Sequence, residues 1–133
     1  SGSVVSPTIS VGWLRWQDDG RRQQRGDVVR GLLEAGCRFV MSTDCGIPGV
    51  PHDAIADGLR AFCEYGGIEP STALRLATSD AAGRLGLPDR GVLEPGRRAD
   101  LMVVAGDPLK DLEALSRVRA VFVAGHQVAG TPL

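Results

Sequence analysis

The segment Arg38–Asp44 constrains the fold of this chain more than any other, because an apolar run stops there at a carboxylate. Large apolar residues at 39–41 lead through Ser42 and Thr43 to Asp44, and glycine and proline follow at positions 46, 48 and 49. Glycine and proline do not readily continue a β-ladder. We therefore predict a short buried strand over residues 38–43 whose carboxyl end delivers Asp44 into a loop.

The residues before this strand favour a helix. Apolar side chains at positions 28, 29, 32, 33 and 35 recur with helical spacing, and Gly36 stands where a helix C-cap is expected. A helix followed by a buried strand is an α/β unit, and functional side chains gather at the carboxyl ends of strands in such folds. Asp44 is therefore the leading candidate for a catalytic or ligand residue. The alternative is an ordinary turn in which its carboxylate binds nearby backbone N–H groups.

The remaining elements change in kind along the chain. Residues 4–11 favour a strand that Pro7 interrupts, and residues 12–24 favour a loop or irregular helix whose Trp13 and Trp16 pack on the body of the protein. Helices are predicted over residues 52–66, 70–78 and 81–85. Beyond Pro88 the pattern becomes strand-like, with apolar bursts at 91–93, 101–104 and 118–123. We predict two parts with a boundary near Pro88, covering residues 1–87 and 88–133.

Charge and cysteine usage exclude several classes of function. The net charge of the 133 residues is −1, which gives no indication of binding to nucleic acid or to an anionic membrane. No apolar run is long enough to span a membrane. The three cysteines have no CxxC spacing and are odd in number, so the expected location is the reducing cytoplasm rather than an oxidising compartment.

Four stretches extend in order from residue 36 to residue 128: residues 36–46 (GCRFVMSTDCG), 73–87 (ALRLATSDAAGRLGL), 91–104 (GVLEPGRRADLMVV) and 121–128 (VFVAGHQV). In this order and spacing they resemble the C-terminal part of the amidohydrolase superfamily, especially its imidazolonepropionase-like and prolidase-like members. Ser6-Pro7-Thr8 also fits the strand that precedes the catalytic Asp strand in this family.

The resemblance implies an α/β fold. The family has a metal-bearing (β/α)₈ barrel joined to a small β-sandwich that is built from both chain termini. By that resemblance, residues 4–11 and 38–43 are the seventh and eighth barrel strands, and the helices over 52–85 close the barrel. Residues from Gly91 onward are then the C-terminal half of the β-sandwich.

The resemblance also implies a reaction. Asp44 matches the family's Asp at the end of the eighth strand, where it is a metal ligand and the general base and acid. The cofactor is one or two divalent ions, with zinc expected, which lower the pKa of a bound water. The parent protein is expected to be an enzyme that hydrolyses a carbon–nitrogen bond of a small amide, cyclic amide or dipeptide-type substrate.

The chain departs from the family in its histidines. The family builds its site from a His-x-His pair, a bridging Lys or Glu and two further His, whereas this chain has only His52 and His126. His126 is predicted to lie at the surface in a β-turn. His52 and Cys45 are candidate substrate-pocket residues, although a helix start and a small buried residue are the simpler interpretations. Since a catalytic zinc takes three protein ligands, we expect this chain alone to bind catalytic metal poorly and to be inactive.

Two other polar residues have structural interpretations. Asp100 precedes an apolar strand and is predicted to cap a turn, and Arg84 is predicted to pair with a carboxylate or a helix end. Ser1-Gly2-Ser3 resembles a tag remnant or a cut end, which indicates part of a longer protein. Two alternatives to a hydrolase fragment remain: a chain that completes a site with a partner, and a non-catalytic structural module. Two barrel strands alone leave open edges, so a homo-oligomer is expected.

Overall fold

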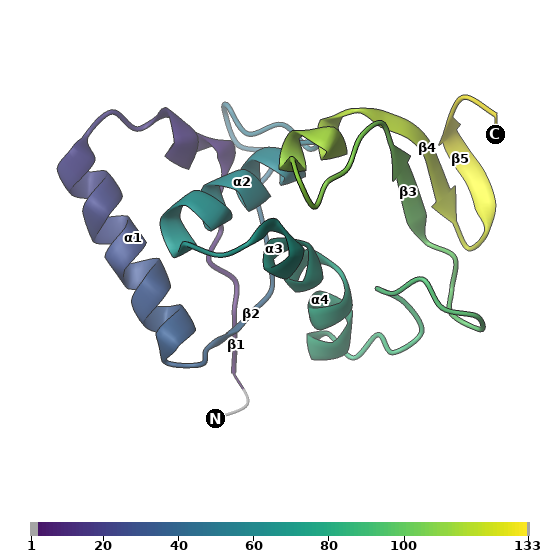
Figure 1. Ribbon diagram of the computed structural model, residues 1–133, viewed down its shortest axis with the longest axis horizontal. Helices are drawn as coiled ribbons and strands as arrows, with labels where there is room; N and C mark the ends of the chain where they lie inside the picture. The colour runs from purple at the N-terminus through teal and green to yellow at the C-terminus, as the bar shows by residue number, and fades with distance from the viewer. Residues whose placement is uncertain (1–2, 133) are drawn as a thin grey trace.

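The computed structural model describes residues 3–132, in which four helices lie beside a small sheet (Figure 1). The helices are α1 (Asp19–Glu34), α2 (Ile55–Gly66), α3 (Pro70–Ala77) and α4 (Ser79–Arg84), with two 3-10 helices, η1 (Val11–Arg15) and η2 (Leu112–Ser116). The strands are β1 (Val4–Val5), β2 (Arg38–Phe39), β3 (Leu101–Val104), β4 (Val118–Val123) and β5 (His126–Gly130). They form a two-stranded sheet, β1-β2, and a three-stranded sheet in the order β3-β4-β5.

The first sheet and α1 form a parallel β-α-β unit. Val4 pairs with Arg38 and Val5 with Phe39, and α1 lies between the two strands in the sequence. This arrangement confirms the predicted α/β class. Both strands are shorter than predicted. The Val40 N–H donates one further hydrogen bond to the Val5 carbonyl, at 2.9 Å.

The predicted strand over residues 4–11 is wrong in its second half. Val11 begins η1 instead, because the Ser10 side chain accepts a hydrogen bond from Gly12 N–H and caps the turn. Pro7 has no N–H to donate to a ladder, and Thr8 has a positive φ of 47°. Extended pairing therefore stops near Val5.

The chain beyond β2 continues in an extended manner. Phe39, Met41 and Thr43 are buried, Val40 and Ser42 are half-buried, and Asp44 is exposed. This alternation is what a period-2 backbone gives when one face packs against a core. The segment 38–43 is thus buried on one face only.

Helix α1 begins at Asp19, nine residues before the first residue of the predicted apolar stripe, Val28. The Asp18 side chain accepts a hydrogen bond from Arg21 N–H at 2.9 Å and caps the helix. Arg25 then lies 5.8 Å from the Trp13 ring centre, while Trp13 and Trp16 stack at 5.2 Å. The two tryptophans pack on the body of the protein as predicted, and residues 19–24 are helical.

Helix α2 lies at the centre of the core. It is buried along one face by Leu59, Phe62 and Tyr65, and the Phe62 ring lies 5.5 Å from that of Phe39. It ends as predicted at Gly66, with Gly67 in the left-handed C-cap conformation (φ 65°). The core therefore forms between α2 and the segment that leads to Asp44.

The predicted strand over residues 91–93 does not form. Gly91 has φ 88°, and a β-carbon there would lie 2.8 Å from the Ala82 β-carbon and 2.9 Å from the Thr78 carbonyl oxygen. This loop therefore packs on the junction of α3 and α4 instead of joining the sheet. The predicted helices over 70–78 and 81–85 correspond to α3 and α4, although α4 begins at Ser79.

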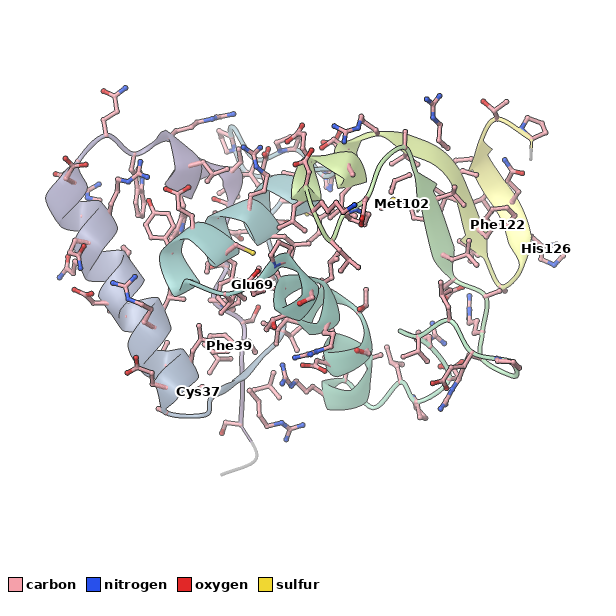
Figure 2. The ribbon with its side chains drawn as sticks, viewed as in Figure 1. Cys37, Phe39, Glu69, Met102, Phe122 and His126 are labelled. Carbon is pink, nitrogen blue, oxygen red and sulfur yellow. The ribbon has the colours of Figure 1, made fainter. Side chains whose placement is uncertain are left out.

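The three-stranded sheet is antiparallel. Strands β3 and β4 match the predicted segments 101–104 and 118–123. His126 does not lie in a turn, as predicted, but begins β5 opposite Val123, since the turn is made one step earlier by Ala124 and Gly125, both with positive φ. The side chain of His126 is exposed and projects from the outer end of the sheet, so its surface position is confirmed (Figure 2).

The helical part and the sheet are joined through η2. Leu112 of η2 is buried in the same core as Leu59 and Phe62, and Glu113 pairs with Arg60 of α2 at 2.8 Å. The cysteines at 37, 45 and 63 are free thiols. Among residues 3–132, no helix has the length and apolar character that crossing a membrane requires.

Candidate functional site

Asp44 stands at the end of the extended segment that follows β2. Its backbone has φ 55°, a left-handed conformation that costs energy for most residues and that Asp tolerates better than β-branched ones. Its side chain is exposed, and within residues 3–132 it makes no hydrogen bond or ion pair. The carboxylate is therefore free to bind a ligand.

The loop after Asp44 is closed by its own backbone. Gly46 N–H donates to the Val50 carbonyl and Val50 N–H to the Ile47 carbonyl, both at 3.0 Å. Gly46 and Gly49 have φ of 92° and 83°, which glycine adopts without strain. Val50 is buried against Val11 and Ala54 and anchors the loop to η1 and to the start of α2. These contacts hold the loop from Gly46 to Val50 in a fixed conformation beside Asp44.

This loop borders an open hollow of about 480 Å³. Its lining consists of Arg15, His52 and five residues of the loop: Gly46, Ile47, Gly49, Val50 and Pro51. A β-carbon at Gly46 would lie 3.6 Å from the His52 Cε1 atom, so the imidazole lies beside the loop at Gly46. Cys45 is exposed and neither it nor Asp44 belongs to this lining. Of the three predicted site residues, His52 thus lines the hollow. Asp44 and Cys45 directly precede Gly46, the first loop residue of the lining.

Two contacts that hold the Asp44 segment were not predicted. The hydroxyl groups of Ser6 and Ser42 lie 2.6 Å apart and join the two extended segments beyond the ladder. Arg84 pairs with Asp80 at 3.4 Å, as predicted, and its guanidinium also donates to the Phe39 carbonyl of β2. No sequence signal distinguishes these serines from other surface serines, and the Arg84 contact spans 45 positions.

Cys63 of α2 is a partly buried thiol that packs against the core. Burial raises the pKa of the Cys63 thiol, and the nearby Glu69 carboxylate raises it further. A thiol with a raised pKa forms little thiolate near neutral pH and is a poor nucleophile. We therefore assign Cys63 of α2 to the core.

The loop offers one ligand of the type that a divalent metal takes. Asp44 presents a free carboxylate, which suits zinc and magnesium alike. Within residues 3–132, no three His, Cys, Asp or Glu side chains come together as a metal-holding group. Since a catalytic zinc takes three protein ligands, Asp44 fits as one member of such a ligand set.

Comparison with known proteins decides the family. The profile of the Amidohydrolase family matches residues 19–128, which is most of the chain. The chain belongs to the amidohydrolase family. This finding confirms the resemblance drawn from the four sequence stretches, and the matched range includes Asp44, His52, strands β3 and β4, and the first residues of β5.

Three similar proteins illustrate this amidohydrolase family membership. An adenine deaminase of Methanoregula boonei is 44% identical over 77 residues, which are 58% of this chain and 14% of that protein. An imidazolonepropionase of Deinococcus deserti is 35% identical over 102 residues, which are 74% of this chain and 26% of that protein. A crystal structure of a prolidase candidate from Bifidobacterium longum superposes with a TM-score of 0.82 at 30% identity, over 98% of this chain and 37% of that one.

The amidohydrolase chain described here therefore spans between about a seventh and two fifths of these relatives. Imidazolonepropionases and prolidases were the members named from the sequence, and adenine deaminases are an addition. The superposition covers both the helices and the sheet, so the α/β arrangement is that of amidohydrolase structures.

Proposed function

We propose that this chain is part of a metal-dependent amidohydrolase in which Asp44 is a metal ligand and the general base and acid. The observation that carries the proposal is the position of Asp44, which is exposed and unpaired at the end of the segment after β2 in a parallel β-α-β unit. Chemistry collects at this end of the strands in barrels and parallel sheets. Membership of the amidohydrolase family supports the same role.

The proposal includes an architecture for the parent protein. Strands β1 and β2 would be the last two strands of a (β/α)₈ barrel, α2 to α4 would close it, and the sheet β3-β4-β5 would belong to a small β-sandwich. The two parts would be residues 1–87 and 88–133. The alternating burial of residues 39–43, with the helices on one side, is the pattern that a barrel strand has.

The proposed reaction is hydrolysis of a carbon–nitrogen bond in a small molecule, such as an amide or cyclic amide. The names of the relatives, adenine deaminase, imidazolonepropionase and prolidase candidate, support this class. A divalent metal, zinc in our proposal, supplies Lewis-acid polarisation of the scissile carbonyl and a more acidic water when bound. Asp44 takes a proton from the attacking water and returns it to the leaving nitrogen, since a carboxylate can both bind metal and accept a proton. The parent enzyme is proposed to act in the cytoplasm.

Replacement of Asp44 tests this role in the parent protein. We expect Asp44→Asn to lower kcat by roughly 10²- to 10⁴-fold, the range typical of general acid–base groups, and to lower the metal content measured by elemental analysis. Asp53→Asn is the matched control, because Asp53 is also exposed near the loop and lies outside the proposed site. The 133-residue chain alone is expected to hold less than one zinc. An active Asp44→Asn enzyme with full metal content would contradict the proposal.

A second candidate function is a structural module that associates with copies of itself or completes a site with a partner chain. The observation that favours it is the exposure of large apolar side chains, including Leu93 at 82% and Leu85 at 60%. Such surfaces mark interaction sites when they are contiguous. In this case Asp44 would contribute to a site only in the assembly.

A further inference from the structure

We propose that Arg15 and His52 bind a carboxylate of the substrate in the hollow beside the Asp44 loop. This inference rests on the proposed function and narrows its substrate class. The substrate would be a small amide or cyclic amide that carries a free carboxylate away from the scissile carbon–nitrogen bond. Its binding group would lie in the hollow of about 480 Å³, a volume typical of small-molecule sites.

Arg15 has a free guanidinium. It is exposed at the end of η1, and within residues 3–132 its side chain makes no hydrogen bond or ion pair. By contrast, Arg22 pairs with Glu64 and Arg30 with Asp27. Since η1 is capped by Ser10 and held by the buried Val11, the base of the Arg15 side chain is fixed at the rim of the hollow.

The two glycines of the loop bring Arg15 and His52 close to its backbone. A β-carbon at Gly49 would lie 3.6 Å from the Arg15 Nη1 atom, and one at Gly46 would lie 3.6 Å from His52 Cε1 and 3.8 Å from its Nε2. The two side chains therefore lie beside the same loop, at two glycines that are three residues apart in the sequence.

The charge of the lining suits an anion. Arg15 is its one charged side chain, and the rest of the lining is glycine, apolar residues, proline and His52. A guanidinium binds a carboxylate through two parallel hydrogen bonds, and an imidazole N–H can donate a third. With no acid in the lining to neutralise Arg15, the hollow favours a carboxylate over an uncharged amide.

The test is a titration of the isotope-labelled chain with N-acetylglycine, compared with its uncharged analogue N-acetylglycinamide. We expect the acid to cause saturable NMR shifts at the Arg15 guanidinium and the His52 ring, and the amide to cause none. Arg15→Gln should weaken binding of the acid at least tenfold. Arg75→Gln is the matched control, because Arg75 is likewise exposed and unpaired within the described residues but lies on α3.

Equal binding of acid and amide, shifts that map elsewhere, or unchanged binding in Arg15→Gln would overturn this inference. In the parent enzyme, Arg15→Gln should raise KM for a carboxylate-bearing substrate with little change in kcat, whereas Asp44→Asn should lower kcat. Binding of the acid by a parent protein that hydrolyses no amide would overturn the proposed function and leave this site in place. Hydrolysis of amides by a parent protein that does not prefer the acid would support the proposed function and overturn the carboxylate site.

Discussion

At the scale of single residues, the position of Asp44 depends on a residue that has no side chain. Gly58 lies at the end of the first turn of α2, where a β-carbon would come 2.9 Å from the Ile9 carbonyl oxygen and 3.1 Å from the Thr43 Cγ2 atom. The helix can therefore lie directly against the two segments that extend β1 and β2. Thr43 precedes Asp44, so the packing of α2 determines where the carboxylate stands.

We predict that Gly58→Ala lowers the free energy of unfolding by roughly 1–3 kcal/mol, as overpacking of a core does. Alanine would otherwise stabilise a helix by up to about 1 kcal/mol relative to glycine. Gly31→Ala in α1 is the control, because nothing lies within 4 Å of a β-carbon there. It should raise stability by about 0.5–1 kcal/mol. Urea unfolding followed by circular dichroism measures both, and equal changes of the same sign would contradict the packing argument.

At the scale of elements, the hairpin of β4 and β5 is held by Asp100. Its carboxylate accepts a hydrogen bond from Ala124 N–H at 2.8 Å in the turn, and a second from Arg98 at 2.8 Å. The Ala124 bond and then the Arg98 side chain hold the pKa of Asp100 below its ordinary value of 3.8. The prediction that Asp100 caps a turn is confirmed.

This lowered pKa makes the hairpin sensitive to acid. A carboxylate with a depressed pKa in the folded state contributes stability above its ordinary pKa and loses it as the pH falls through the folded value. We expect Asp100→Asn to reduce the fall in unfolding free energy below pH about 4. Asp89, whose pKa Arg90 lowers, accounts for part of the remainder. Thermal unfolding at several pH values measures the effect, and an unchanged pH profile in Asp100→Asn would contradict it.

The sequence predicted those elements whose apolar residues face one core. The period of 3.6 located α2, and the apolar bursts located β3 and β4, because each of these buries apolar side chains. Helix α3 was located by Pro70, which lies in its first turn. The first turns of α1 carry no such stripe. There the helix packs through two of its own arginines, Arg21 over the Trp16 ring and Arg25 over the Trp13 ring. A search for apolar spacing does not detect such contacts.

The candidate site was predictable only in part. Asp44 was identified from its place after an apolar run, and His52 from its nearness in the sequence. Arg15 was missed because its relation to Gly49 is set by the path of the chain through η1, which begins where a strand was expected. The Ser6–Ser42 contact depends on the register of two parallel strands, and register cannot be read from either strand alone.

At the scale of the whole molecule, an apolar surface lies between α4 and β3. Two adjoining hollows of about 320 and 270 Å³ share Thr78, Gly91 and Asp100. Their walls carry exposed large apolar side chains: Leu85, Leu87, Leu93 and Met102. We expect this surface to be covered by a second copy when the chain is alone in solution.

Light scattering tests this expectation. We predict a mass of at least twice 14.0 kDa at high concentration, because burial of apolar area stabilises an assembly by about 25 cal/mol per Å². Leu93→Lys should shift the chain toward the monomer, since it places a charge in the apolar surface. Leu109→Lys is the control, because Leu109 is similarly exposed at 58% and lies outside both hollows. A monomer at every concentration would contradict the prediction.

The contact between Arg84 and the Phe39 carbonyl has a consequence for assembly. Val40 N–H points toward β1, so the Phe39 carbonyl, one residue earlier, points to the opposite edge of β2. Arg84 of α4 thus occupies an acceptor that a further strand would use. Addition of a strand at this edge would be an exchange of one hydrogen bond for another, with little net gain. The favourable free energy of adding a strand would then come from burial of apolar side chains. Arg84 would block non-specific strand pairing at this edge of β2 until the neighbouring barrel strand displaced it.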